Sequence, residues 1–167
     1  MTVIRSWPTQ PSYINCLAAR IQKGLARFPE PAQVVYSAHS LPREFIEQGD
    51  PYVDEIQQTI SALEKITGHQ GRLCYQSRSG PVEWLEPSTP EMLKTLAGQR
   101  VKNILMVPIS FVSDHIETLY EIDMLYKDQA ADLGMTLEST PGLNDDPQFI
   151  SGLRDLVLTA TSEQDGS

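Results

Sequence analysis

Residues 103–123, NILMVPISFVSDHIETLYEID, contain in one stretch both kinds of segment from which the rest of the chain is built. Residues 103–107 form a short apolar run, too short for a buried helix and typical of a β-strand. Residues 113–133 have helical spacing, begin with residues that favour a helix N-terminus and are followed by Gly134. This stretch therefore predicts a strand followed by a long helix.

The same alternation continues on both sides. Further strands are predicted at residues 33–37, 72–76 and 135–138. Further helices are predicted at residues 12–28, 51–67, 89–98 and 147–161. Two of these helices carry clear start signals, because Asp50 precedes Pro51 and Thr89 precedes Pro90. Strands that alternate with helices of this length favour a parallel sheet covered on both faces.

We therefore expect residues 1–167 to form a single α/β domain, with a four-stranded parallel sheet in a three-layer αβα arrangement. The sequence contains no internal repeat, and no linker that would suggest a second domain. In such sheets, ligands bind outside the carboxyl ends of the strands. The loops that follow the predicted strands are therefore the places to look for functional residues.

Composition excludes several classes of function. The formal net charge is −9, and no basic cluster is present, so we expect no nucleic-acid partner. No run approaches the roughly 20 apolar residues that span a bilayer, although weak peripheral membrane contact stays open. The polar amino terminus does not resemble a signal peptide. Cys16 and Cys74 are isolated, which indicates reduced core residues of a cytoplasmic protein.

Candidate ligand-binding residues follow the first two predicted strands. His39 lies just beyond the first strand, where it either takes part in chemistry or simply bonds to a neighbouring carbonyl. The loop after the second strand contains Arg78 and Trp84. Arg78 can meet a ligand carboxylate or stay solvated. Trp84 can stack on a planar ligand or cover the core.

Acidic residues recur in the long predicted helix. On a regular α-helix, Asp114, Glu117, Glu121 and Asp128 fall within roughly 60° of arc. No lysine or arginine alternates with them in that arc, although like charges one turn apart destabilise a helix by about 0.2–0.5 kcal/mol per pair. A solvated face normally mixes both signs of charge. The pattern therefore favours the handling of a cation.

Several long motifs, taken together and in this order, resemble the carboxyl-terminal half of the ferrochelatase family. They are SAHSLP (37–42), GDPY (49–52), YQSR (75–78), GPVEWL (80–85) and PISFVSDHIETLYE (108–121). The resemblance extends from Arg5 to about Leu158. It implies a chelatase-like fold, a Rossmann-like half of the family's chain. It also implies a lyase that inserts Fe²⁺ into protoporphyrin IX or coproporphyrin III, with release of two protons, in a terminal step of haem biosynthesis.

The resemblance also assigns roles within the acidic helix and the first loop. His39 and Glu117 match the family's facing histidine and glutamate, which bind the metal ion or take the pyrrole protons. Asp114 and Glu121 would form an acidic path for metal delivery or proton removal. The family often has a π-type turn in this helix, which would rotate the acidic side chains.

Porphyrin contacts are implied for the loop after the second strand. Trp84 would lie in the porphyrin cleft, with Ser77 and Arg78 as further substrate-binding residues. The implied partners are the porphyrin, ferrous iron as a substrate, and a preceding amino-terminal half that is absent here. No permanently bound cofactor is expected, and no Fe–S cluster, because residues 159–167 contain no cysteine.

Two alternatives stay open at this point. The chain can be a porphyrin-binding fragment that is inactive without the amino-terminal half. It can also be a cobalt or nickel chelatase that acts on sirohydrochlorin, since those proteins resemble this fold more distantly.

Overall fold

A parallel sheet forms the centre of the protein in the computed structural model, which describes residues 3–162. Within the described residues it has four strands, β1 (Gln33–His39), β2 (Gly71–Gln76), β3 (Asn103–Pro108) and β4 (Thr136–Ser139). Their order across the sheet is β2-β1-β3-β4, and every neighbouring pair is parallel. The predicted four-stranded parallel sheet is therefore confirmed.

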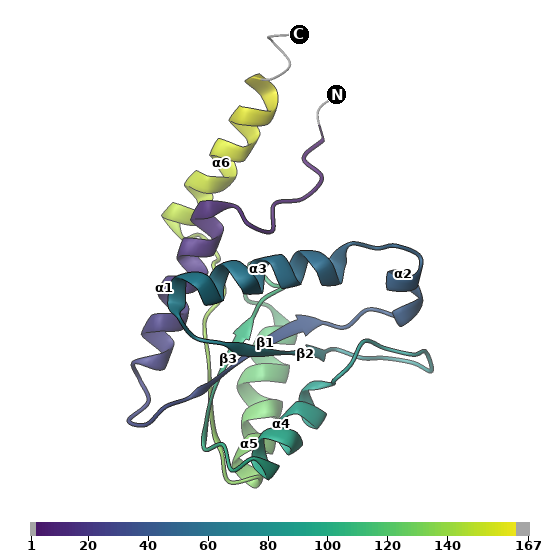
Figure 1. Cartoon of the computed structure of the whole chain (residues 1–167), viewed down its shortest axis with the longest axis vertical. Helices are drawn as coiled ribbons and strands as arrows, with labels where there is room; N and C mark the ends of the chain where they lie inside the picture. Colours follow the sequence, from purple (N-terminus) through teal and green to yellow (C-terminus); the bar gives the residue numbers. More distant parts are fainter. Residues whose placement is uncertain (1–2, 163–167) are drawn as a thin grey trace.

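Helices cover both faces of this sheet (Figure 1). One face packs against α1 (Pro11–Leu25) and α3 (Tyr52–Thr67), and α6 (Pro147–Ser162) packs in turn on α1. The opposite face packs against α4 (Thr89–Gly98) and α5 (Lys127–Asp132), together with the π-helix η1 (Glu117–Tyr126). The three predicted layers are present.

The strand sequences explain why the sheet has two apolar faces. Successive side chains of a strand point to opposite faces. In β3, Leu105 and Val107 belong to the core under α1 and α3, whereas Ile104 and Met106 belong to the core over α4 and η1. A near-continuous apolar run is therefore what this central strand requires.

Some helix boundaries differ from the prediction. The structure places the N-caps at Pro51 and Ser88, one residue later and one residue earlier than the predicted caps Asp50 and Thr89. Ser88 forms a capping box with Glu91, which satisfies backbone N–H groups at the start of α4. The short helix α2 (Arg43–Glu47) was not predicted, and it has no buried residue that would have produced an apolar period.

The long predicted helix at residues 113–133 is wrong as a single α-helix. Residues 117–126 form the π-helix η1, and only Lys127–Asp132 is α-helical after it. In a π-helix the backbone bonds join residues five apart. The 60° arc calculated for a regular α-helix therefore does not describe the acidic residues. The π-type turn implied by the family resemblance is present.

The order of the strands creates a switch point between β1 and β3. The chain leaves β1 toward α3 on one face and leaves β3 toward η1 on the other. The loops after these two adjacent strands therefore diverge, and such a crevice is where open α/β sheets bind ligands. No helix in residues 3–162 has the length and apolar character that crossing a bilayer requires.

A substitution at Gly71, in β2, tests the packing between β1 and β2. A methyl group at Gly71 would overlap the ring of Tyr36, which is fully buried in β1. Gly71→Ala should therefore lower the free energy of unfolding by about 1–3 kcal/mol, as overpacked cores do. Urea denaturation measures this change.

Gly98 provides the matched control, because a methyl group there meets no atom within 4 Å. Gly98→Ala, at the end of α4, should leave the free energy of unfolding unchanged or raise it by up to about 1 kcal/mol. An equal loss of stability in both variants would show that the contact with Tyr36 is not the cause.

Candidate active site

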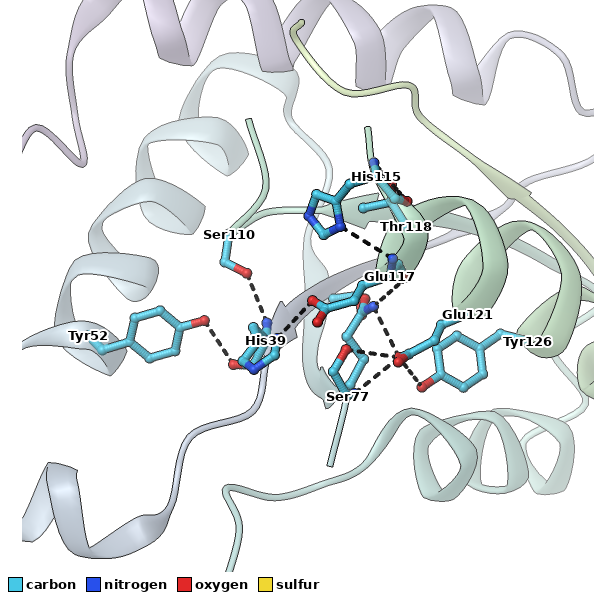
Figure 2. A network of polar contacts seen from close by, with 11 residues as sticks. His39, Tyr52, Ser77, Ser110, His115, Glu117, Thr118, Glu121 and Tyr126 are labelled. Atoms are coloured by element: carbon cyan, nitrogen blue, oxygen red, sulfur yellow. Dashed lines mark hydrogen bonds and ion pairs between the residues drawn. The ribbon is translucent and has the colours of Figure 1, made fainter. Parts of the chain in front are cut away.

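The structure brings together an imidazole and a carboxylate that are far apart in the sequence. His39 ends β1, and Glu117 begins η1, which follows β3. His39 Nδ1 lies 3.1 Å from Glu117 Oε2 (Figure 2). The two side chains are 37% and 36% exposed, so the pair is open to a ligand. The contact lies at the carboxyl ends of β1 and β3, at the switch point.

The backbone of His39 is held on both sides. Its N–H donates to Ser110 Oγ at 2.8 Å, and its carbonyl accepts from the Tyr52 hydroxyl at 2.8 Å. Burial raises the pKa of the Tyr52 phenol, so this hydroxyl stays a donor at neutral pH. Ser110 follows β3, and Tyr52 begins α3. Two neighbouring elements therefore fix the position of the imidazole.

A second histidine lies next to the pair. The backbone N–H of Glu117 donates to His115 Nδ1 at 3.2 Å. Since Nδ1 accepts this bond, the proton of a neutral His115 is on Nε2. The ring of Phe111 packs edge-on against both imidazoles, with centroid distances of 6.2 Å to His39 and 5.0 Å to His115. The two histidines thus share one aromatic neighbour.

Glu121, one turn along η1, is tied to the end of β2. Its Oε2 accepts from the backbone N–H and the hydroxyl of Ser77, at 3.1 and 3.0 Å, and from Gln76 Nε2 at 3.3 Å. Gln76 is buried, accepts from Ser37 Oγ at 2.6 Å and donates to the Glu117 carbonyl at 2.9 Å. One amide therefore links β1 and β2 with Glu117 and Glu121 of η1.

Asp114 takes part in a different set of contacts. Its Oδ1 accepts from the Gly142 N–H at 2.9 Å, and its Oδ2 accepts from Asn144 Nδ2 at 2.9 Å. Its own N–H donates to Asn144 Oδ1 at 2.9 Å. Both carboxylate oxygens are thus bonded to the loop between β4 and α6. These bonds connect that loop to the segment just before η1. The role of Asp114 in metal delivery stays a prediction.

The predicted porphyrin-binding loop is anchored to the loop after β1. Backbone bonds join Arg43 N–H to the Glu83 carbonyl at 2.8 Å and Leu85 N–H to the Leu41 carbonyl at 3.1 Å. The Arg78 guanidinium donates to the carbonyl of Leu85. Trp84, half-buried, lies between these bonds. The two loops therefore form one wall beside the site.

A hollow with mixed polar and apolar walls lies next to Glu121. Its lining includes Tyr75, Ser77, Arg78, Tyr120 and Leu125. Tyr120, Leu119, Met124 and Ile116 form an exposed apolar surface on and just before η1. The acidic side chains are thus bordered by apolar surface that a flat apolar ligand can cover.

No group of three or more His, Cys, Asp or Glu side chains in the described part of the chain could hold a metal ion by itself. The His39–Glu117 pair offers two ligands, one imidazole and one carboxylate, which suit a divalent cation of the iron type. Cys16 and Cys74 are buried free thiols. Burial raises the pKa of Cys74 to about 11, so it is not a reactive thiolate at neutral pH.

Sequence reasoning identified His39, Glu117 and Glu121 but missed the residues that hold them. Gln76, Tyr52 and Ser110 lie inside the quoted motifs, yet their contacts cross between strands and helices. A buried amide at the end of a strand was the available signal for Gln76, since such a group requires polar partners.

Comparison with known proteins agrees with these motifs. A family model described as Ferrochelatase matches residues 1–161. A ferrochelatase of Desulfotalea psychrophila is 64% identical over 166 residues, which cover 99% of this chain and 52% of that protein. A ferrochelatase of Geotalea uraniireducens is 49% identical over 158 residues, which cover 92% of this chain and 50% of that protein. This chain spans about half the length of the curated relatives it matches.

Among solved structures, this fold is similar to CbiX of Marinobacter aquaeolei VT8, a protein with a suggested role in cobalamin (vitamin B12) biosynthesis. The TM-score is 0.56 and the identity 19%, with 82% of this chain and 100% of that chain covered. At this identity the likeness shows a shared fold alone. The family match and the identical residues show more: the chain belongs to the ferrochelatase family.

Proposed function

We propose that this chain provides the metal-handling half of a ferrochelatase, which inserts Fe²⁺ into a porphyrin and releases two protons. One observation supports this proposal most directly. His39 Nδ1 and Glu117 Oε2 lie 3.1 Å apart at the switch point of the sheet, open to a ligand. The membership of the ferrochelatase family supports a porphyrin and ferrous iron as the substrates.

The chemistry requires both a base and a foothold for the metal ion. The porphyrin must lose two N–H protons as it gains a dication. Nε2 of His39 makes no hydrogen bond to any residue that the structure describes, while its Nδ1 faces Glu117. Nε2 can therefore take a pyrrole proton or bind Fe²⁺, and Glu117 stabilises the imidazolium that forms in the first case. One lone pair serves only one of these roles at a time.

The surroundings suit a large planar ligand. Large apolar side chains are exposed on η1, the same helix that carries Glu117 and Glu121. Ser77 and Arg78 line the hollow beside Glu121. Arg78 uses part of its guanidinium for the Leu85 carbonyl, and its remaining N–H groups can meet a porphyrin carboxylate.

The amino-terminal half of the relatives is the partner that we propose for the exposed apolar surfaces. Large apolar side chains are exposed on η1 and also on α6, where Ile150, Val157 and Leu158 are each about half exposed. Figure 1 shows that α6 extends away from the sheet layers. Contiguous apolar surface of this kind marks an interaction site.

The free thiols of Cys16 and Cys74 agree with a reducing compartment such as the cytoplasm.

Sirohydrochlorin chelation is a weaker candidate. The likeness to CbiX shows the fold alone, whereas the family model that matches residues 1–161 is that of ferrochelatase. Insertion rates measured with Fe²⁺, Co²⁺ and Ni²⁺ into protoporphyrin and into sirohydrochlorin separate the two activities.

Removal of the imidazole tests the assigned chemistry. In a mixture of this chain with the amino-terminal half of the Desulfotalea psychrophila protein, His39→Ala should lower kcat for metal insertion by roughly 10²–10⁴-fold, the range expected for a lost general base. Glu117→Gln, which keeps the shape but loses the charge, should lower kcat by about tenfold or more. Formation of zinc or iron porphyrin is followed by absorbance.

His69→Ala is the matched control, since His69 is exposed on the turn before β2 and its side chain bonds to no residue among those that the structure describes. It should leave kcat unchanged. If porphyrin binds the mixture normally but His39→Ala turns over at the wild-type rate, the assigned mechanism is wrong.

Dependence on the second half tests the partner proposal. Alone, this chain should quench porphyrin fluorescence only weakly and should show little metal insertion, because one wall of the cleft is missing. Addition of the amino-terminal half should tighten porphyrin binding and restore insertion. Full activity of the chain alone would contradict the need for that partner.

A further inference from the structure

Tyr126, the last residue of η1, contacts an acidic residue of the site from within the core. Its hydroxyl donates to Glu121 Oε2 at 3.1 Å (Figure 2). The residue is 5% exposed, and its ring packs in the apolar core between the sheet and α4. The polar end of a core side chain therefore reaches an active-site carboxylate.

The π-helix explains why these two groups meet. Tyr126 follows Glu121 by five residues, which is the spacing of the backbone hydrogen bonds in a π-helix. On a regular α-helix, residues five apart point about 140° away from each other. The contact therefore depends on the π geometry of residues 117–126.

The hydroxyl acts as a permanent donor. Burial, and then the charge of Glu121, raise the pKa of the Tyr126 phenol well above neutral pH. With Gln76 and the two donors of Ser77, Oε2 of Glu121 accepts four hydrogen bonds. Oε1 accepts none from the residues that the structure describes. One carboxylate oxygen is held and the other is available.

We propose that Tyr126 is a positioning residue that holds the Glu121 carboxylate at the wall of the active site, with Oε1 turned free for a passing divalent cation. This inference rests on the proposed function, because the cation is the metal substrate. The apolar packing of the ring does not need the hydroxyl. The hydroxyl instead forms its hydrogen bond with Glu121.

A double-mutant cycle tests the proposal in the two-half mixture. Tyr126→Phe keeps the ring and removes one donor, so the KM for Zn²⁺ or Fe²⁺ should rise roughly three- to tenfold, with the KM for porphyrin unchanged. In a Glu121→Gln background the same change should have no further effect on the metal KM. Additive effects, or an equal change in both KM values, would overturn the positioning role.

Tyr36→Phe is the matched control. Tyr36 is also buried, and its hydroxyl has no hydrogen-bond partner among the described residues. Removal of this hydroxyl should leave both KM values unchanged. A rise in the metal KM for Tyr36→Phe equal to that for Tyr126→Phe would show a general effect of losing a buried hydroxyl, and the proposal would be wrong.

A stability measurement, which does not require metal insertion, separates this inference from the proposed function. In urea unfolding of the 167-residue chain, Tyr126→Phe and Glu121→Gln should be coupled by roughly three- to tenfold in the unfolding equilibrium constant. Absence of coupling overturns the inference even if metal insertion is observed. Coupling in the chain, together with no metal insertion by the two-half mixture, would instead overturn the proposed function and support the contact alone.

Discussion

The parallel register of β1 with its two neighbours is the constraint on which the site depends. His39 is paired with Gln76 of β2, and Ser37 is paired with Pro108 of β3. The Ile109 N–H continues the β1–β3 pairing by donating to the Ser37 carbonyl at 2.9 Å. Because parallel strands end at one edge, the three loops that follow them meet there. A shift of one residue would turn the side chain of His39 to the other face.

The π-helix then determines which side chains of the acidic segment reach this edge. Glu117 faces His39, and Glu121 is bonded to the end of β2 and to Tyr126. Asp114 precedes the helix and is bonded to the loop after β4 instead. Acids that a regular helix would place in one row therefore have separate surroundings.

Buried polar groups connect these parts into one unit. Gln76 bonds to Ser37 in β1 and to the carbonyl of Glu117 in η1. An amide in the core is stable only when its polar atoms have partners, so its contacts are specific in direction as well as distance. The open side of the site differs, because its apolar side chains are exposed on η1. The site therefore has an inner wall held by hydrogen bonds and an outer surface with exposed apolar side chains.

The sequence by itself determined the αβα layers, since a near-continuous apolar run such as residues 104–107 requires a sheet covered on both faces. It also determined the family, through motifs that are long and in order, and it identified His39 and Glu117 as candidates. Only the tertiary structure decided that Asp114 is bonded to the loop after β4, and that Tyr126 meets Glu121. The α-helical period assumed from sequence is about 3.6 residues, whereas the backbone hydrogen bonds of the π-helix η1 join residues five apart. Contacts between residues 78 positions apart, such as His39 and Glu117, depend on strand order and register, which no local pattern in the chain encodes.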